Sequence, residues 1–172
     1  GSLSKILAPG VRLGYLLARS PMLNAIVSKR FDAGSNYFAS AVVAEFYKDG
    51  IWGHCAATNP VLKHKRDLII NGLKDTAEDI CVWSTPIGGL FMWVRMPEDV
   101  DMAKLIQTAN EKGVYFAPGS SFHVDAKTVP YIRLAFGHVP DNLIQEGIPI
   151  LTNCIKESRT SNAARNFDTL FD

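Results

Sequence analysis

The segment of residues 80–136 constrains the fold most, because its hydrophobic pattern changes there from the period of helices to that of strands. ICVW and LFMWVRM predict two strands, which the glycine-rich turn at residues 85–89 joins. A helix follows, which Asp101 is expected to cap and Gly113 to end. VYFAPGSSF and TVPYIRLAF predict two further strands, and an amphipathic helix comes last. This order of elements predicts an α+β layer in which helices cover one face of a sheet.

The two helices of this layer are expected to pack through apolar residues that recur at helical spacing. These residues are Met102, Leu105, Ile106 and Ala109 in the first helix and Ile144, Ile148, Leu151 and Ile155 in the second. Pro149 should kink or restart the second helix, because its ring removes one backbone hydrogen bond. The residues after Ser158 lack helical periodicity, and we expect them to be loosely held.

Helices also dominate the predictions for residues 21–75. PMLNAIVSKRF is a candidate for a short amphipathic helix, and Ser35 or Asn36 should cap a second helix that Gly50 ends. The expected core face of that second helix consists of Ala39, Val42, Val43, Phe46 and Tyr47. A long helix should be regular from about residue 60 to 74, after a break, because Pro60 favours the first helical position.

The first eighteen residues, GSLSKILAPGVRLGYLLA, contain the residues most suggestive of chemistry. Lys5 lies among small and apolar neighbours, and desolvation disfavours a charged ammonium, which makes an amine more nucleophilic. Pro9 and Gly10 turn the chain, and VRLGYLLA predicts a buried strand that begins at Arg12. Arg12 lies seven residues after Lys5. A guanidinium at this distance along the chain would suit a phosphate that is bound near an imine of the lysine.

This segment closely resembles the active-site segment of pyridoxal-phosphate-dependent aminotransferases of fold type I. The resemblance is to the class I/II branch that includes the 2-aminoadipate and kynurenine aminotransferases, and it rests on Ser-Leu-Ser-Lys followed by Ala-Pro-Gly-Val-Arg-Leu-Gly-Tyr. It implies that Lys5 carries the cofactor as an imine and that Ser2 and Arg12 hold the cofactor phosphate. Ser4 is a weaker candidate for the same phosphate.

Two later segments resemble the same family. Residues 86–93 match its Pro-x-Gly-Gly-x-Phe-x-Trp segment, and YIRLAF matches a segment whose arginine clamps the substrate α-carboxylate. That resemblance assigns the carboxylate to Arg133, although an arginine within a strand is by itself as often part of a salt bridge. Phe122 resembles the aromatic residue that lines the substrate pocket, and His123 stands where the family often has an aromatic residue.

The resemblance also implies the domain organisation, an α/β to α+β arrangement. Residues 1–55 would end the large cofactor-binding domain, residues 56–75 would form the interdomain helix, and residues 76–172 would form the small α+β domain. The family places more than half of its residues before the lysine segment. We therefore expect this chain to be a fragment of a larger enzyme, which is a homodimer in most relatives.

Composition excludes several other classes of function. A net charge of +1 gives no reason to expect a nucleic acid or an anionic membrane as a partner, and no apolar run is long enough to cross a membrane. Cys55, Cys81 and Cys154 are widely spaced, which is typical of reduced thiols in an intracellular, cytoplasmic protein. No cysteine or histidine cluster has the spacing of metal ligands.

The function expected from these observations is transfer of an amino group between an amino acid and a 2-oxo acid. Two alternatives stay open: a lyase or synthase reaction on the same pyridoxal-phosphate scaffold, and a non-enzymatic role as the aminotransferase-like effector domain of a transcription regulator. The second alternative predicts a DNA-binding segment upstream. The 172-residue chain alone should be inactive, because none of its residues is assigned to the cofactor ring.

Overall fold

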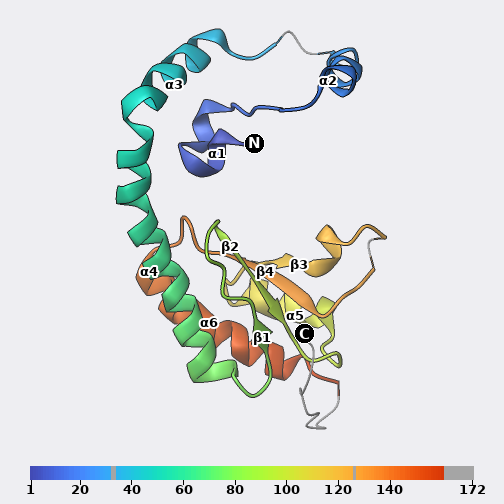
Figure 1. The fold of residues 1–172 in the computed structure, drawn as a ribbon. Coiled ribbons are helices and arrows are strands. Elements are labelled where there is room, and N and C mark those ends of the chain that lie inside the picture. Colours follow the sequence, from blue (N-terminus) through green and yellow to red (C-terminus); the bar gives the residue numbers. More distant parts are fainter. Residues whose placement is uncertain (32–33, 126, 161–172) are drawn as a thin grey trace. The chain divides into compact units, whose positions relative to one another are not determined.

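The computed structural model describes residues 1–31, 34–125 and 127–160. The chain divides into two compact units, Gly1–Val61 and Leu62–Asp172, and the long helix α4 (Ile51–Ala77) contributes to both. Figure 1 shows the elements in chain order, with those of the first unit in blue to cyan.

Unit 1 is helical in its described residues. It contains the one-turn helix α1 (Leu3–Ile6), the 3-10 helix η1 (Pro9–Val11), α2 (Ser20–Val27), α3 (Tyr37–Asp49) and the start of α4. Asn36 caps α3 as predicted, since its side-chain oxygen accepts a hydrogen bond from the Ala39 amide at 3.0 Å. The core face predicted for α3 is confirmed only at Val43, because Val42 and Phe46 are exposed.

The buried strand predicted for VRLGYLLA is wrong. Val11 ends η1, Arg12 adopts the left-handed region, and the chain then runs through Tyr15, Leu16 and Leu17 with all three side chains exposed. Its only strand-like pairing among the described residues is the isolated bridge between Ser2 and Gly14. A strand is stable only when its backbone amides and carbonyls find partners, and these residues offer a single bridge.

The break predicted before Pro60 is also wrong, because α4 is continuous from Ile51 to Ala77. Proline removes one helical hydrogen bond, whose acceptor would be the carbonyl of Ala56. Both Pro60 and Ala56 are exposed, so water can hydrate that carbonyl. Burial of α4 further along, at Ile69 and Leu73, favours the helix and offsets the loss.

Unit 2 contains a four-stranded antiparallel sheet with the order β1-β2-β4-β3. Its strands are β1 (Val82–Trp83), β2 (Phe91–Arg95), β3 (Ala117–Pro118) and β4 (Tyr131–Ala135). In the central pair, Trp93 lies opposite Arg133 and Val94 lies opposite Ile132. Side chains alternate between the two faces of a strand, so Val94 and Ile132 share one face and Trp93 and Arg133 share the other.

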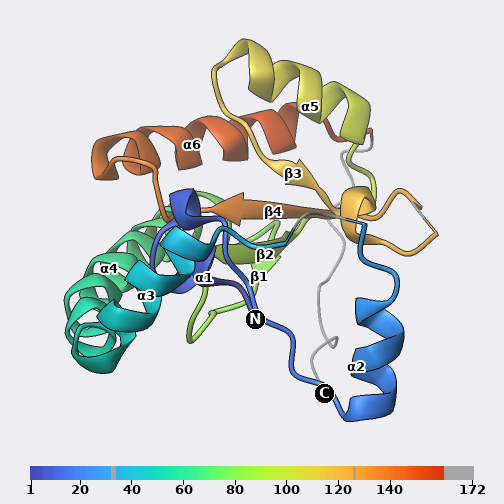
Figure 2. The same cartoon turned by 90° about the horizontal axis from the view of Figure 1, so that it is seen from above.

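Helices cover the face that carries Val94 and Ile132. The helices α5 (Met102–Glu111) and α6 (Asp141–Glu157) lie together on one side of the sheet in Figure 2. The core between the sheet and the helices is buried; its members include Leu73, Met92, Val94, Leu105, Ala109, Ile132, Ile144, Ile148, Leu151 and Ile155. The predicted layer of helices on one face of an antiparallel sheet is therefore confirmed.

The capping residues and turns of unit 2 match the sequence expectations. Asp101 accepts hydrogen bonds from the amides of Ala103 and Lys104, and Gly113 ends α5 with a φ of 78°. Of the kink or restart predicted at Pro149, the restart is wrong, because α6 is continuous through this residue. The kink stays a prediction. Pro149 is exposed, whereas the opposite face of α6 is buried on either side of it. The predicted loose tail lies outside the described residues from residue 161 onward.

Candidate active site

A closed loop at the start of the chain brings together three of the predicted site residues. The Leu3 amide donates to the Leu13 carbonyl at 3.0 Å, and the bridge between Ser2 and Gly14 lies beside this bond. Within the loop, Nη1 of Arg12 donates to Oγ of Ser4 at 3.4 Å. Residues 1–15, which we call the N-terminal loop, thus hold Ser2, Ser4 and Arg12 in one closed segment.

Two backbone features fix the geometry of the N-terminal loop. Arg12 has φ 51° and ψ 38°, a left-handed conformation that is uncommon for residues other than glycine. Nη1 of Arg12 also donates to the Pro9 carbonyl at 3.2 Å, which ties the side chain back to the turn. A Cβ atom at Gly14 would lie 2.9 Å from the Gly1 carbonyl oxygen, so the close approach of the two chain segments requires glycine.

Lys5 lies in α1, and its side chain is exposed. The desolvation expected from its apolar neighbours in sequence is therefore not found. The reason is geometric: successive residues of a helix point in different directions, so neighbours in sequence do not surround the lysine amine. Ile6, the next residue, is itself 43% exposed.

The N-terminal loop has an unbalanced positive charge, which was not among the features predicted from the sequence. The loop contains the basic residues Lys5 and Arg12, and no aspartate or glutamate precedes Asp32 in the chain. Arg12 makes no ion pair with any carboxylate among the residues that the structure describes. The run of sequence without acidic residues was a readable signal, because a guanidinium without a carboxylate partner is available to bind an external anion.

Arg133, the other predicted cation, lies on the exposed face of the sheet in unit 2, in contact with two aromatic rings. Its Cζ atom is 4.0 Å from the ring centroid of Phe91 and 4.1 Å from that of Phe122. The side chain is half-buried, and it forms no ion pair with a carboxylate in the described part of the chain. The alternative role of Arg133, a structural salt bridge, is therefore not found in the described part of the chain.

Further aromatic residues extend this cluster. The Trp93 ring meets the Phe122 ring edge-on, with centroids 5.4 Å apart and an interplanar angle of 84°, and lies 5.9 Å from the Tyr131 ring. Phe91 and Trp93 were not among the site residues predicted from the sequence. Their alternate positions in FMWVR were the available signal, because residues two apart in a strand share a face.

The turn at residues 85–89 is anchored to α4. Nη1 of Arg66 donates to the Pro86 carbonyl at 2.9 Å, and Gly89 adopts a φ of 82°, which favours glycine. His123 is exposed, and its Nδ1 accepts a hydrogen bond from the Asp125 amide at 3.2 Å. A role of His123 in substrate selection stays a hypothesis.

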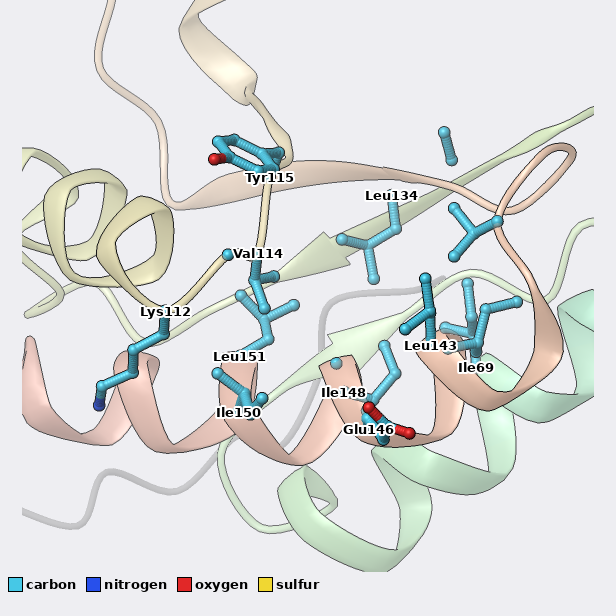
Figure 3. Close-up of a pocket in the computed structure, with 15 residues that line it drawn as sticks. Ile69, Lys112, Val114, Tyr115, Leu134, Leu143, Glu146, Ile148, Ile150 and Leu151 are labelled. Carbon is cyan, nitrogen blue, oxygen red and sulfur yellow. The ribbon is translucent and has the colours of Figure 1, made fainter.

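A cavity of about 380 Å³ lies on the other face of the sheet from Arg133, between α6 and the end of α5. Figure 3 shows Leu134 and Val114 among its mostly apolar lining residues. None of the predicted site residues lines it. Leu134 follows Arg133 directly in β4 and therefore points to the opposite face, so this cavity is distinct from the aromatic cluster.

Among the described residues, no helix is long and apolar enough to cross a membrane. No group of acidic, histidine or cysteine side chains in the same residues could hold a metal ion. The three cysteines are free: Cys81 and Cys154 are buried and Cys55 is half-buried.

The chain belongs to the aminotransferase class I and II family, whose sequence profile matches residues 1–149. The resemblance seen in the sequence is thereby confirmed. The chain is 33% identical over 162 residues to aromatic-amino-acid aminotransferase 1 of Thermococcus litoralis, a match that covers 91% of this chain and 38% of that protein. It is also 30% identical over 160 residues to an uncharacterized HTH-type transcriptional regulator of Bacillus subtilis, covering 91% of this chain and 33% of the regulator.

Solved aminotransferases have the same fold. The multiple substrate aminotransferase from Thermococcus profundus matches with a TM-score of 0.84 and 32% identity, over 92% of this chain and 40% of that one. The kynurenine aminotransferase from Pyrococcus horikoshii, solved in complex with PMP, matches with a TM-score of 0.84 and 31% identity over 91% of this chain and 40% of that one. The chain thus spans about two fifths of the length of these relatives.

Proposed function

We propose that the protein containing this chain is a pyridoxal-phosphate-dependent aminotransferase, which moves an amino group between an amino acid and a 2-oxo acid. The observation that carries the proposal is the contact of Arg12 with Ser4 in a loop that also contains Lys5 and has no acidic residue. Membership of the family and the named aminotransferases among the relatives support it.

The groups of the N-terminal loop fit the phosphate end of this cofactor. A guanidinium and the hydroxyls of Ser2 and Ser4 are the donors that a phosphate monoester needs, and Arg12 has no described carboxylate that would compete. We assign the phosphate to Ser2, Ser4 and Arg12. When bound, pyridoxal phosphate supplies a ring that accepts the electrons of the bond broken at the substrate Cα.

Lys5 would attach the cofactor and then act as the base that moves the proton at the substrate Cα. Its exposed amine is accessible to both tasks. Arg133 would bind the α-carboxylate, because its fork of N–H donors matches a carboxylate and no described carboxylate neutralises it. Phe122 would line the carboxylate end of the substrate pocket, where its ring contacts Arg133.

The larger-scale assignments rest on the resemblance to the family. We propose that residues 1–55 belong to the cofactor-binding domain, that residues 56–75 connect the domains, and that residues 76–172 form the small domain. We further propose that the full-length protein is a cytoplasmic homodimer with amino acid and 2-oxo acid substrates.

The test is the Lys5→Ala variant of the full-length protein, with Lys29→Ala as the matched control, since Lys29 is also exposed in unit 1. Lys5→Ala should lose transamination, and borohydride reduction followed by mass spectrometry should find no covalently attached cofactor. Lys29→Ala should keep both properties. Turnover by Lys5→Ala without an added amine would refute the assignment.

A second candidate function is that of an effector domain in a transcription regulator. The HTH-type regulators of Bacillus subtilis and Staphylococcus aureus, which are 30% and 28% identical to this chain, favour it. A lyase or synthase reaction on the same pyridoxal-phosphate scaffold is a third hypothesis. Product analysis of the full-length protein with and without a 2-oxo acid acceptor separates the three candidate functions. An aminotransferase turns over only with the acceptor, a lyase or synthase turns over without it, and a regulator shows no turnover in either case.

A further inference from the structure

We propose that Phe91 and Phe122 are positioning residues, which hold the guanidinium of Arg133 ready to bind a carboxylate. The inference rests on the proposed function, in which Arg133 anchors the substrate. The two ring centroids lie 4.0 and 4.1 Å from the Arg133 Cζ, so both rings are in contact with the guanidinium. A cation within about 6 Å of an aromatic ring centroid is attracted by the ring quadrupole.

The two rings stabilise the charge of Arg133 without using its hydrogen-bond donors. Aromatic rings offer electron density to a cation but no lone pair to its N–H groups. Within residues 1–31, 34–125 and 127–160, the Arg133 guanidinium has no hydrogen-bond acceptor and no carboxylate partner. Its donors are therefore available for a ligand, and the bidentate geometry of guanidinium suits a carboxylate.

Two other elements, β2 and the 3-10 helix η2 (Gly119–Phe122), place these rings beside Arg133. Phe91 comes from β2, which pairs with β4 and places Trp93 directly opposite Arg133. Phe122 ends η2, and Trp93 supports its ring edge-on. Because each ring is fixed by a different element, the guanidinium loses rotamer freedom on folding and loses less when a substrate binds.

Gly119 explains how η2 comes so close to β4. A Cβ atom at this position would lie 2.7 Å from Cγ2 of Val129 and 2.8 Å from the Tyr131 carbonyl oxygen. Real Cβ atoms do not approach other atoms so closely, so only glycine permits this packing. The contact sets the position of Phe122, three residues further on, over Arg133.

A ring that positions Arg133 and a ring that contacts the substrate side chain predict different kinetics. The α-carboxylate is common to all amino acids, so loss of a ring that positions Arg133 should weaken every substrate by a similar factor. A ring that contacts the substrate side chain would instead change the preference between small, branched and aromatic amino acids. The ratio of KM values between such substrates therefore distinguishes the two roles.

The experiment compares Phe91→Leu and Phe122→Leu with Phe91→Tyr in the full-length protein. Phe116→Leu is the matched control, because Phe116 packs against the core and forms no cation–π pair with Arg133 among the described residues. Each leucine variant should raise KM about three- to tenfold for alanine, leucine and phenylalanine alike, from the usual strength of a cation–π contact. Phe91→Tyr keeps the ring and should keep the KM, and Phe116→Leu should change it little.

A double-mutant cycle with Arg133→Gln completes the test, since glutamine removes the cation. With Gln at position 133, Phe91→Leu should raise KM less than twofold further, because the ring has no charge left to hold. Additive effects, or a KM change confined to one class of side chain, would overturn the positioning role.

If Arg133→Gln raises KM strongly while both leucine variants do not, the positioning role is wrong and the proposed function stands. If Arg133→Gln leaves KM unchanged, the positioning role of the rings and the proposed carboxylate-binding role of Arg133 are both wrong.

Discussion

Gly119→Ala tests the packing that supports the aromatic cluster. The added methyl group would lie 2.7 Å from Cγ2 of Val129, 2.8 Å from the Tyr131 carbonyl oxygen and 2.9 Å from Cβ of Tyr131. Carbon atoms in favourable contact are about 3.5–4.0 Å apart, so η2 and β4 must separate by roughly 1 Å. The Tyr131 backbone cannot move freely, because β4 is paired on both sides.

The magnitude follows from two opposing terms. Over-packing of a well-packed site costs about 1–3 kcal/mol, and replacing glycine recovers about 0.4–1 kcal/mol by restricting the unfolded chain. We expect a net loss of about 1–2 kcal/mol in the free energy of unfolding of unit 2. For a protein of this size, that corresponds to a fall of roughly 2–8 °C in Tm.

Urea unfolding followed by circular dichroism measures the change, with Gly147→Ala as the control. Gly147 lies within α6 with no atom within 4 Å of the added methyl group, so alanine there should stabilise by about 0.5–1 kcal/mol. Gly119→Ala should also raise KM, because Phe122 shifts away from Arg133. Unchanged stability together with unchanged KM would refute the argument.

Two further predictions concern the thiols and the isolated chain. Burial raises the pKa of Cys81 to about 12 and also raises that of Cys154, so Ellman's reagent should modify Cys55 first and the other two only on unfolding; equal rates in the folded protein would contradict this. Because the folded state disfavours the Cys81 thiolate, its contribution to stability should be unchanged below the ordinary thiol pKa of 9.0 and should fall as the pH rises from there towards 12. Cys81→Ala should make this fall smaller, and the part due to Cys154 should remain. Residues 1–172 alone, mixed with pyridoxal phosphate, should show neither tight stoichiometric binding nor turnover, because no residue assigned here holds the cofactor ring.

Local signals determined much of unit 2. Asp101 at the start of α5, Gly113 at its end and the apolar stripe of α6 each act within one or two helical turns, so the sequence alone predicts them. The alternation around Arg133 in YIRLAF likewise predicts which residues face the core. The resemblance to aminotransferases, based on residues that are contiguous in sequence, needed no structure either.

The tertiary structure decided what depends on distant partners. VRLGYLLA has the composition of a buried strand, but the described residues offer it one bridge, and without partners its backbone does not form a sheet. Pro60 has the properties of a helix start, yet burial of Ile69 and Leu73 carries α4 through it. The rings around Arg133 come from two other elements, β2 and η2. The contacts of these rings with Arg133 depend on strand register and on close packing between elements. The sequence pattern of β2 or η2 alone does not specify these contacts.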